Sequence, residues 1–281
     1  MCSSDLDNKA DWLKLEQLAL DIAFVGPDFI DVITDMNQLE QLREQGFRVE
    51  ILHEKLSEFY RSRIETEKDM GGYMTLSEIS ARADSLVMAH INICDKFLIG
   101  QSIEGRDIYA IKISDYAKVD EDEPELLFTA AIHAREVITP LVVFNVMEYL
   151  LDNYGTDSAL TYLVDNRELF CVNPGNPDGY YYNESTNPSG GGKWRKNRRD
   201  NGDGSYGVDL NRNYSYEWGY DDEGSSPTTS DATYRGTGPF SEPETQIMRD
   251  FTEAREFVIT LYFHSYRSEE RRVGKECRSR W

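Results

Sequence analysis

The spacing of hydrophobic positions near the start of the chain predicts a small unit that mixes strands and helices. Four segments follow one another: a strand at 27–34, a helix at 35–45, a strand at 47–52 and a helix at 54–64. Leu39 and Leu42 share one face of the first helix, and Gly46 is placed to end it, since glycine readily adopts a positive φ. We predict an α+β unit over residues 7–65, followed by a polar connector.

A longer unit with more continuous apolar runs begins near Tyr73. Its predicted elements are a helix at 76–90, a hairpin over 96–115, a buried strand at 125–133, a helix at 140–154, a buried strand at 167–174, a helix at 242–254 and a buried strand at 256–264. Thr75 with Glu78, and Ser241 with Glu244, have the spacing of capping boxes. Strands that are apolar on both faces and alternate with helices predict an α/β domain with a mixed, mostly parallel central sheet flanked by helices.

Composition and charge exclude several classes of protein. With 40% hydrophobic and 12% aromatic residues the chain can bury a core. No apolar run reaches the length of a membrane span, and a net charge of -21 disfavours binding to nucleic acid. We therefore expect neither a membrane nor a nucleic acid as partner. The four cysteines show no CxxC spacing, and Cys94 and Cys171 are predicted to be inert core thiols.

Both ends of the chain are identified as non-native. The segments MCSSDL (1–6) and RSEERRVGKECRSRW (267–281) match in-frame translations of the two ends of a common sequencing adapter. We exclude them from the fold prediction and expect the natural protein to start and end elsewhere. The lack of a signal peptide at the start therefore carries little weight.

Two histidines and a glutamate stand where predicted strands end. His133 and Glu136, in HARE, follow one buried strand, and His264, in FHSY, follows another. The carboxyl ends of strands are where open α/β sheets place ligands. Two histidines and one glutamate with an open fourth position form a catalytic zinc site. A surface histidine beside a glutamate would equally explain the HARE pair if it stood alone.

The motifs around these residues add specificity. In chain order they are SIEGRDIYAIKIS, HARE, NPDGY, WRKNRRDN, GVDLNRNY, YRGTGPFSEPET and FHSY. With them, residues 73–266 resemble the zinc carboxypeptidase family, in particular its bacterial, carboxypeptidase T-like branch. Carboxypeptidase A is a standard example of the two-histidine, one-glutamate zinc site. The resemblance implies an enzyme that hydrolyses the C-terminal peptide bond of peptides and proteins with a zinc-activated water.

The resemblance also assigns roles around the metal. It implies one Zn²⁺ per chain, held by His133, Glu136 and His264. Asp209 would accept the other ring N–H of His133, which fixes the tautomer of that ligand. Arg195 would polarise the scissile carbonyl and stabilise the oxyanion.

Three further residues are implied to hold the substrate. Asn211 and Arg212 match the pair that binds its terminal carboxylate, for which a planar guanidinium offers two parallel hydrogen bonds. Arg135 matches a residue of the neighbouring subsite. The implied partner is a peptide or protein with a free C-terminus, and we expect a monomeric, secreted enzyme. The unit at 7–65 stands where the family has a propeptide that covers the cleft, which predicts a zymogen.

Part of the family pattern is expected downstream of residue 266. The general-base glutamate, the lid tyrosine and the residue at the bottom of the specificity pocket all follow FHSY in the family. We therefore expect this chain to be inactive as it stands. Two alternatives stay open: a non-catalytic metal-binding relative that acts as a peptide-binding module, and a cell-wall peptidase or amidohydrolase on the same fold. The set of Arg195, Asn211 and Arg212 disfavours the second, because it suits a free peptide C-terminus.

Two charged motifs have a plainer interpretation beside a functional one. In WRKNRR we predict that Arg198 and Arg199 are exposed or paired with the carboxylates of DDE (221–223), and the tyrosines of GYYYN are predicted to pack. The acidic loop KVDEDEPELL is usually a solvated surface loop, but similar loops carry calcium in some bacterial relatives. Ca²⁺ is therefore a second candidate cofactor, with the candidate ligands Asp120, Glu121, Glu123 and Glu125.

Overall fold

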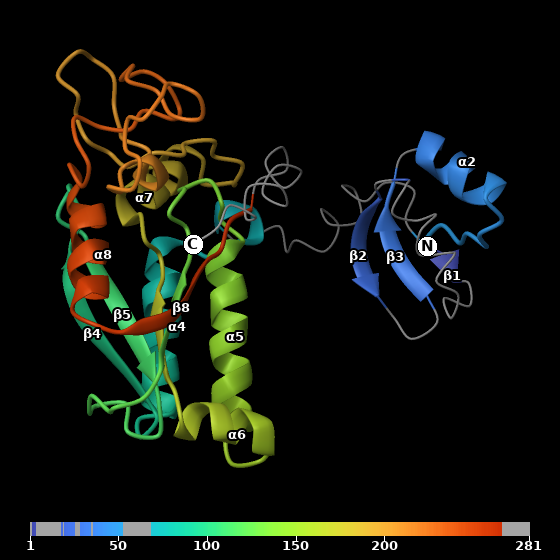
Figure 1. Ribbon diagram of the computed structural model, residues 1–281, viewed down its shortest axis with the longest axis horizontal. Helices are drawn as coiled ribbons and strands as arrows, with labels where there is room; N and C mark the ends of the chain where they lie inside the picture. The colour runs from blue at the N-terminus through green and yellow to red at the C-terminus, as the bar shows by residue number, and fades with distance from the viewer. Residues whose placement is uncertain are drawn as a thin grey trace. The chain divides into compact units, whose positions relative to one another are not determined.

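The computed structural model describes residues 2–3, 18, 20–25, 29–34, 36–52 and 69–265 (Figure 1). The chain forms two compact units, Met1–Ile64 and Glu65–Trp281. The helix predicted at 54–64 and the segment 267–281 lie outside the described residues. None of the helices described is long and apolar enough to cross a membrane.

The first unit contains three antiparallel strands in the order β1-β3-β2 and one described helix. Their bounds are Cys2–Ser3 (β1), Asp21–Val25 (β2), Phe29–Ile33 (β3) and Met36–Glu44 (α2). Leu42 of α2 packs with Ile30 and Phe47, and Gly46 takes a φ of 89° after the helix. The unit is small and α+β, as its pattern predicts.

In the first unit one predicted strand does not form, and one strand forms inside the segment that we predict to be non-native. The segment 47–52 does not form a strand: Val49 makes a single bridge, and Ile51 and Leu52 are exposed. Phe47 and Val49 still contribute to the core, so their apolar spacing reflects burial rather than extended pairing. Strand β1 lies within the segment 1–6 that we identify as non-native. A pairing of two residues uses backbone groups alone, so nearly any sequence can make it.

The second unit is built on a five-stranded mixed sheet in the order β4-β5-β7-β6-β8. The strands span Cys94–Gln101 (β4), Asp107–Ile113 (β5), Glu125–Thr129 (β6), Glu168–Val172 (β7) and Phe257–Tyr262 (β8). Strands β4, β5 and β7 pair antiparallel, whereas β7, β6 and β8 run parallel. The predicted hairpin turns at Gly105, whose φ is 80°.

Helices cover both faces of this sheet. They span Leu76–Ala89 (α4), Thr139–Asn153 (α5), Ser158–Asp165 (α6), Pro177–Thr186 (α7) and Pro243–Glu253 (α8), with short 3-10 helices at Asp69–Gly72 (η1) and Leu210–Arg212 (η2). Figure 1 shows α8 on one side of the sheet and α4 and α5 on the other. Ile111 and Ile113 of β5 pack with α4 and α5, whereas Ile108 and Ala110 pack with α8. The sheet is therefore the middle layer of an α/β/α domain.

One of the two predicted capping boxes forms. Thr75 Oγ1 accepts from the N–H of Glu78 at 3.2 Å, and the Glu78 carboxylate accepts from the N–H of Thr75 at 2.8 Å. The box predicted for α8 is wrong. Ser241 instead donates to the side chain of Glu242, and Glu244 accepts from the N–H of Ile103. Partners from distant segments replace the local ones, and sequence spacing does not reveal them.

Strand β8 forms as predicted but is not buried. Val258, Ile259 and Leu261 are 61%, 48% and 45% exposed. An apolar strand is covered only where another element packs on it, and within residues 69–265 β8 is an edge strand that pairs with β6 alone. The register aligns Thr129 of β6 with Tyr262 of β8. The segments that follow the two strands therefore leave the sheet side by side, at the carboxyl end of the parallel strands.

Candidate metal centre

The segment after β6 folds into a tight turn that brings its polar side chains together. Ala131 takes a φ of 50°, and its N–H donates to the hydroxyl of Thr139 at the start of α5. The N–H of Glu136 donates to the carbonyl of His133 at 3.0 Å. The turn thereby places the side chains of His133 and Glu136 next to each other, beside the end of β8.

Three side chains converge at this edge of the sheet. Nδ1 of His133 lies 2.8 Å from Oε1 of Glu136, and Nδ1 of His264 lies 3.0 Å from Oε2 of Glu136. The two Nδ1 atoms lie 3.1 Å apart. The side chains of His133 and Glu136 are buried, while that of His264 is 22% exposed. The cluster therefore has one side that a ligand can approach.

The chemistry of this cluster fits a zinc ion. Ligand atoms held 2.0–2.2 Å from a tetrahedral zinc lie roughly 3.3–3.5 Å apart, a few tenths of an ångström more than the separations here. Asp209 accepts from Nε2 of His133, so Nδ1 of that ring presents a lone pair to the other two side chains. Lone pairs from two rings and a carboxylate that face one another need a proton or a cation between them. Nitrogen and oxygen donors without sulfur suit zinc.

Asp209 joins the cluster to a buried arginine. Its Oδ1 accepts from Nε2 of His133 at 3.2 Å and from the N–H of Asn211 at 3.0 Å. Its Oδ2 accepts from Nε of Arg195 at 3.0 Å and forms an ion pair with Nη2 of the same guanidinium, also at 3.0 Å. Burial alone would raise the pKa of Asp209, but the bond from His133 and the charges of His133, Arg195 and Arg212 outweigh it and lower the pKa to about 2. Asp209 therefore stays ionised and holds both partners in place.

The same balance sets the charges within the cluster. Burial opposes ionisation of Glu136, but hydrogen bonds with His133 and His264 outweigh it and lower its pKa to about 2. Burial lowers the pKa of His133, yet the bonds to Asp209 and Glu136 raise it above its ordinary value. The ring therefore holds a proton more readily than an ordinary histidine, and a metal that binds there must displace that proton.

The residues predicted to bind substrate lie near Asp209 and Arg195. Asn211 and Arg212 form the short helix η2 directly after Asp209. The guanidinium of Arg212 donates from Nε to the carbonyl of Gly224 at 2.6 Å and from Nη1 to that of Asn211 at 2.9 Å. Arg135 lines, together with Arg195, an open cavity of about 480 Å³. The structure therefore gathers the predicted arginines around the edge of the sheet that carries the cluster.

The acidic loop splits into two groups of carboxylates. Their members are Asp115, Glu121 and Glu123 in the first group and Asp120, Glu125 and Glu168 in the second. One buried oxygen each of Asp115, Glu123 and Glu168 has no hydrogen-bond partner among the described residues. Burial, and then the charges of Glu121, Asp115 and Glu168, raise the pKa of Glu123. Asp115 and Glu168 were not predicted because they lie outside the acidic loop, just after β5 and at the start of β7.

The prediction that Arg198 and Arg199 are exposed or paired with DDE is wrong: both are half-buried, and within residues 69–265 neither pairs with DDE. Arg199 pairs with Glu242 at 2.7 Å, and Asp222 of the DDE segment pairs with Arg235 at 2.8 Å. Arg198 packs against aromatic rings instead. These partners belong to segments that only the fold brings together.

The prediction that the tyrosines of GYYYN pack holds for Tyr180 but not for Tyr181, which is 43% exposed. Tyr180 is buried and donates to the carbonyl of Met74, so it is a packing residue. Cys94 and Cys171 are buried and unpaired. Burial, with a smaller contribution from the charge of Asp95, raises the pKa of Cys94 to about 12, so this thiol is inert at neutral pH.

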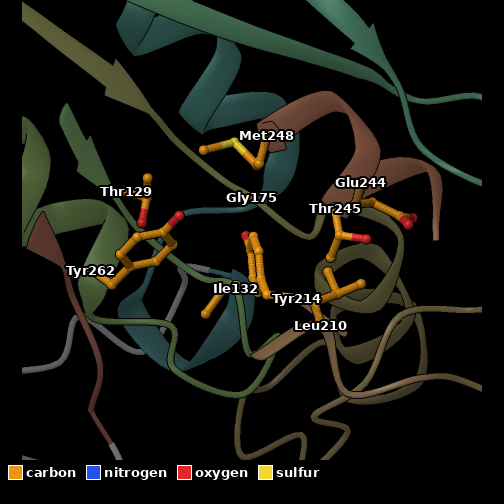
Figure 2. A pocket seen from close by; sticks show the side chains of 9 residues that line it. All are labelled: Thr129, Ile132, Gly175, Leu210, Tyr214, Glu244, Thr245, Met248 and Tyr262. Atoms are coloured by element: carbon orange, nitrogen blue, oxygen red, sulfur yellow. The ribbon is translucent and has the colours of Figure 1, made fainter. Parts of the chain in front are cut away.

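A second, much smaller pocket lies beside the ends of β6 and β8 (Figure 2). Figure 2 shows Tyr262 and Thr129 at one end and Glu244 and Thr245 at the other, with Tyr214 between them. The cavity has a volume of about 10 Å³, close to the room that one water molecule needs. It is too small for a peptide side chain, so it is not a substrate pocket.

Known proteins share this arrangement of sheet and motifs. The family model described as zinc carboxypeptidase matches residues 79–269. The chain belongs to the zinc carboxypeptidase family. It is 32% identical over 217 residues to a zinc carboxypeptidase of Saccharothrix mutabilis subsp. capreolus, covering 73% of this chain and 49% of the relative. It is 35% identical over 198 residues to carboxypeptidase A2 of Rattus norvegicus, covering 69% of this chain and 45% of the relative.

Solved structures of this zinc carboxypeptidase family show the same fold. Bovine thrombin-activatable fibrinolysis inhibitor, solved in complex with tick carboxypeptidase inhibitor, has a TM-score of 0.59 and 29% identity, covering 69% of this chain and 61% of that one. Carboxypeptidase A from Helicoverpa armigera has a TM-score of 0.62 and 24% identity, covering 94% of this chain and 69% of that one. The chain spans about half the length of the first curated relatives that it matches.

Proposed function

We propose that this chain forms the metal-binding part of the active site of a zinc carboxypeptidase of the carboxypeptidase T-like branch, which removes C-terminal residues from peptides and proteins. The proposal rests above all on the convergence of His133, Glu136 and His264 from two strand ends. These three side chains would hold the zinc ion. Zinc, when bound, would polarise the scissile carbonyl and lower the pKa of a water molecule.

The chain's own residues would orient that chemistry. Asp209 keeps His133 in one tautomer and binds the Nε and Nη2 edge of Arg195, which fixes the plane of the guanidinium. A buried, pre-oriented guanidinium suits the oxygen of the scissile carbonyl, where negative charge develops during hydrolysis. Arg195→Ala should therefore lower the rate of the chemical step more than it weakens substrate binding.

We propose that Asn211 and Arg212 bind the terminal carboxylate of the substrate, with Arg135 in the neighbouring subsite. The two hydrogen bonds of Arg212 within the described residues use Nε and Nη1, which leaves Nη2 for a ligand. Arg212→Ala should weaken the binding of free-acid peptides at least tenfold more than that of their C-terminal amides. Arg212→Lys is the matched control, because it keeps the charge but not the planar fork. Equal loss for acids and amides would reject the proposal.

A proton acceptor is needed for turnover. Within residues 69–265 the carboxylates bonded to the cluster are Glu136 and Asp209, one placed as a ligand and the other holding His133 and Arg195. We propose that the general base lies outside these residues. The competing candidate is a peptide-binding module without turnover. Comparing hydrolysis by the zinc-loaded 281-residue chain and by the protein expressed from its gene decides between them, since a general base contributes about 10²–10⁴ in rate.

We further propose that the acidic groups around the loop bind Ca²⁺. Orphaned buried carboxylate oxygens of Asp115, Glu123 and Glu168 are hard donors of the kind that calcium prefers. Calcium should raise the melting temperature of the chain, and Glu123→Gln should reduce that shift. No shift with millimolar calcium would reject this proposal.

The remaining family features stay predictions. We propose a monomeric, secreted enzyme made as a zymogen, on the strength of the family resemblance. Expression of the full-length gene tests all three features, through protein in the culture medium, its size in solution, and activity before and after cleavage between the two units.

A further inference from the structure

The open cavity beside Arg195 has an unusual charge. Its volume is about 480 Å³, and among the described residues that line it five side chains are cationic and none is a carboxylate. The cations are Arg135, Lys193, Arg195, Lys196 and Arg198. The chain as a whole carries a net charge of -21, so this concentration of positive charge does not follow from its composition.

Arg198 is held in this cavity by aromatic rings rather than by a counter-ion. Its guanidinium carbon lies 3.8 Å from the centre of the Tyr182 ring, 4.7 Å from that of Trp194 and 4.8 Å from that of Tyr206. Its Nε is buried without a hydrogen-bond partner, and no carboxylate in residues 69–265 pairs with it. The next residue, Arg199, pairs with Glu242 at 2.7 Å. Stacking fixes the plane of the Arg198 guanidinium, and no carboxylate of the described second unit neutralises its charge.

Three carboxylates of the described residues near the cavity already accept hydrogen bonds. Asp209 binds Arg195, and Asp203 accepts from the hydroxyls of Ser205 and Thr229. Asp231, between the lining residues Ser230 and Ala232, accepts from the hydroxyl of Ser226 at 2.6 Å. Lys196 is largely buried and donates to a backbone carbonyl at 2.8 Å. Arg198 and the exposed Lys193 therefore remain as cations that a ligand can reach.

We propose that this cavity is a subsite for acidic side chains of the substrate, on the amino-terminal side of the scissile bond, with Arg198 as the residue that selects them. The inference rests on the proposed function. If Arg212 holds the substrate's C-terminus and the cluster faces the scissile bond, the preceding residues pass Arg195 and reach the cavity it lines. A fixed guanidinium can bind a carboxylate through two parallel hydrogen bonds. Salt screens distant charges beyond about 8 Å, so the local cations outweigh the net negative charge.

A pair of matched peptides tests this inference. Acetyl-Glu-Glu-Glu-Ala-Phe and its Gln-Gln-Gln counterpart differ in charge but hardly in shape. We expect the Glu peptide to bind the zinc-loaded 281-residue chain about tenfold tighter by calorimetry, and less so as salt rises. Arg198→Gln should bring the Glu-to-Gln ratio close to one, while Arg198→Lys should keep part of it. Equal affinities on the unaltered chain, or an unchanged ratio in Arg198→Gln, would overturn the proposal.

Two further measurements distinguish failure of this inference from failure of the proposed function and from loss of folding. C-terminal amides of both peptides remove the group that Arg212 is proposed to bind. If the amides still bind better with Glu than with Gln, the acidic subsite is supported. If amidation does not change the affinity, the proposed carboxypeptidase binding is contradicted, but the acidic subsite is not. If Arg198→Gln unfolds the chain, the Lys193→Gln variant is measured instead, because Lys193 is exposed and its loss should not disturb the fold. That variant should lower the ratio two- to threefold, and no change would contradict the proposal.

Discussion

Nδ1 of His264 lies 3.0 Å from Oε2 of Glu136, although 128 positions separate the two residues in the chain. The contact follows from the parallel pairing of β6 and β8, in which Thr129 stands opposite Tyr262. His264 lies two residues beyond Tyr262, and Glu136 lies in the turn after β6, which the hydrogen bond from the N–H of Ala131 to the hydroxyl of Thr139 holds in place. The proposed metal site therefore combines the end of one strand with a turn that hydrogen bonds hold at the end of another.

The first prediction concerns Asp209, which accepts a hydrogen bond from the proposed ligand His133. Asp209→Asn keeps the shape of the side chain but weakens its hold on His133 and Arg195. Loss of such a partner typically lowers metal affinity 10–100-fold, and we expect a decrease of that size in a competitive zinc titration. Asp222→Asn, which changes an exposed carboxylate paired with Arg235, should leave zinc affinity unchanged. If both variants bind zinc like the unaltered chain, Asp209 does not position a ligand.

The sequence was most informative where local pattern and tertiary environment agree. The capping box at Thr75, the hairpin at Gly105 and the buried strand β7 all depend on residues close in the chain. The HARE and FHSY motifs predict strand ends, and their convergence follows once the strands are parallel. Glu244 shows the limit: its spacing from Ser241 predicts a cap, but distant donors bind its carboxylate instead.

The surroundings of the candidate site could not be predicted for the same reason. The rings around Arg198 come from helix α7 and from two parts of the long segment after it, which share no sequence pattern. Asp115 and Glu168 join the acidic loop only through the ends of β5 and β7. The exposure of β8 depends on which elements pack on it, and the apolar pattern of a strand does not encode that.

A second prediction concerns acid stability in the absence of metal. Glu136 and Asp209 each have a pKa of about 2 in the folded chain, below their ordinary values of 4.5 and 3.8. A lowered folded pKa gives stability that is present above the ordinary value and is lost as the pH falls through the folded value. Urea unfolding of the metal-free chain should therefore show falling stability from about pH 4.5 to pH 2. Asp209→Asn should have a shallower slope there; an identical slope would contradict these charges.

A third prediction has the opposite sign. Burial, with a smaller contribution from Asp178, raises the pKa of Glu244 from its ordinary 4.5 to about 7. Between these values the folded chain keeps a proton that the unfolded chain releases, so stability should fall as the pH rises through this window. Glu244→Gln cannot titrate and should flatten the stability profile between pH 4.5 and 7. A profile that retains the full slope would mean that Glu244 is not its source.

A fourth prediction tests the packing beneath Arg195. An added methyl group at Gly179 would overlap the carbonyl oxygen of Lys196 and lie 2.8 Å from Cβ of Ala134. Overpacking of this kind costs about 1–3 kcal/mol, and here it would push on the neighbours of both His133 and Arg195. Gly179→Ala should lower both the melting temperature and zinc affinity. Gly238→Ala, where no atom lies within 4 Å, should change neither by more than a small amount. Equal behaviour of the two variants would contradict this packing.

The central claim is that His133, Glu136 and His264 together hold one zinc ion. The most direct test is the zinc content of the purified chain after dialysis against zinc-free buffer, measured by mass spectrometry of the metal beside a variant that carries His133→Ala and His264→Ala. The account predicts about one zinc per chain in the first protein and almost none in a folded sample of the second, since two of the three ligands are gone. Equal zinc in both proteins would place the metal elsewhere and contradict the account.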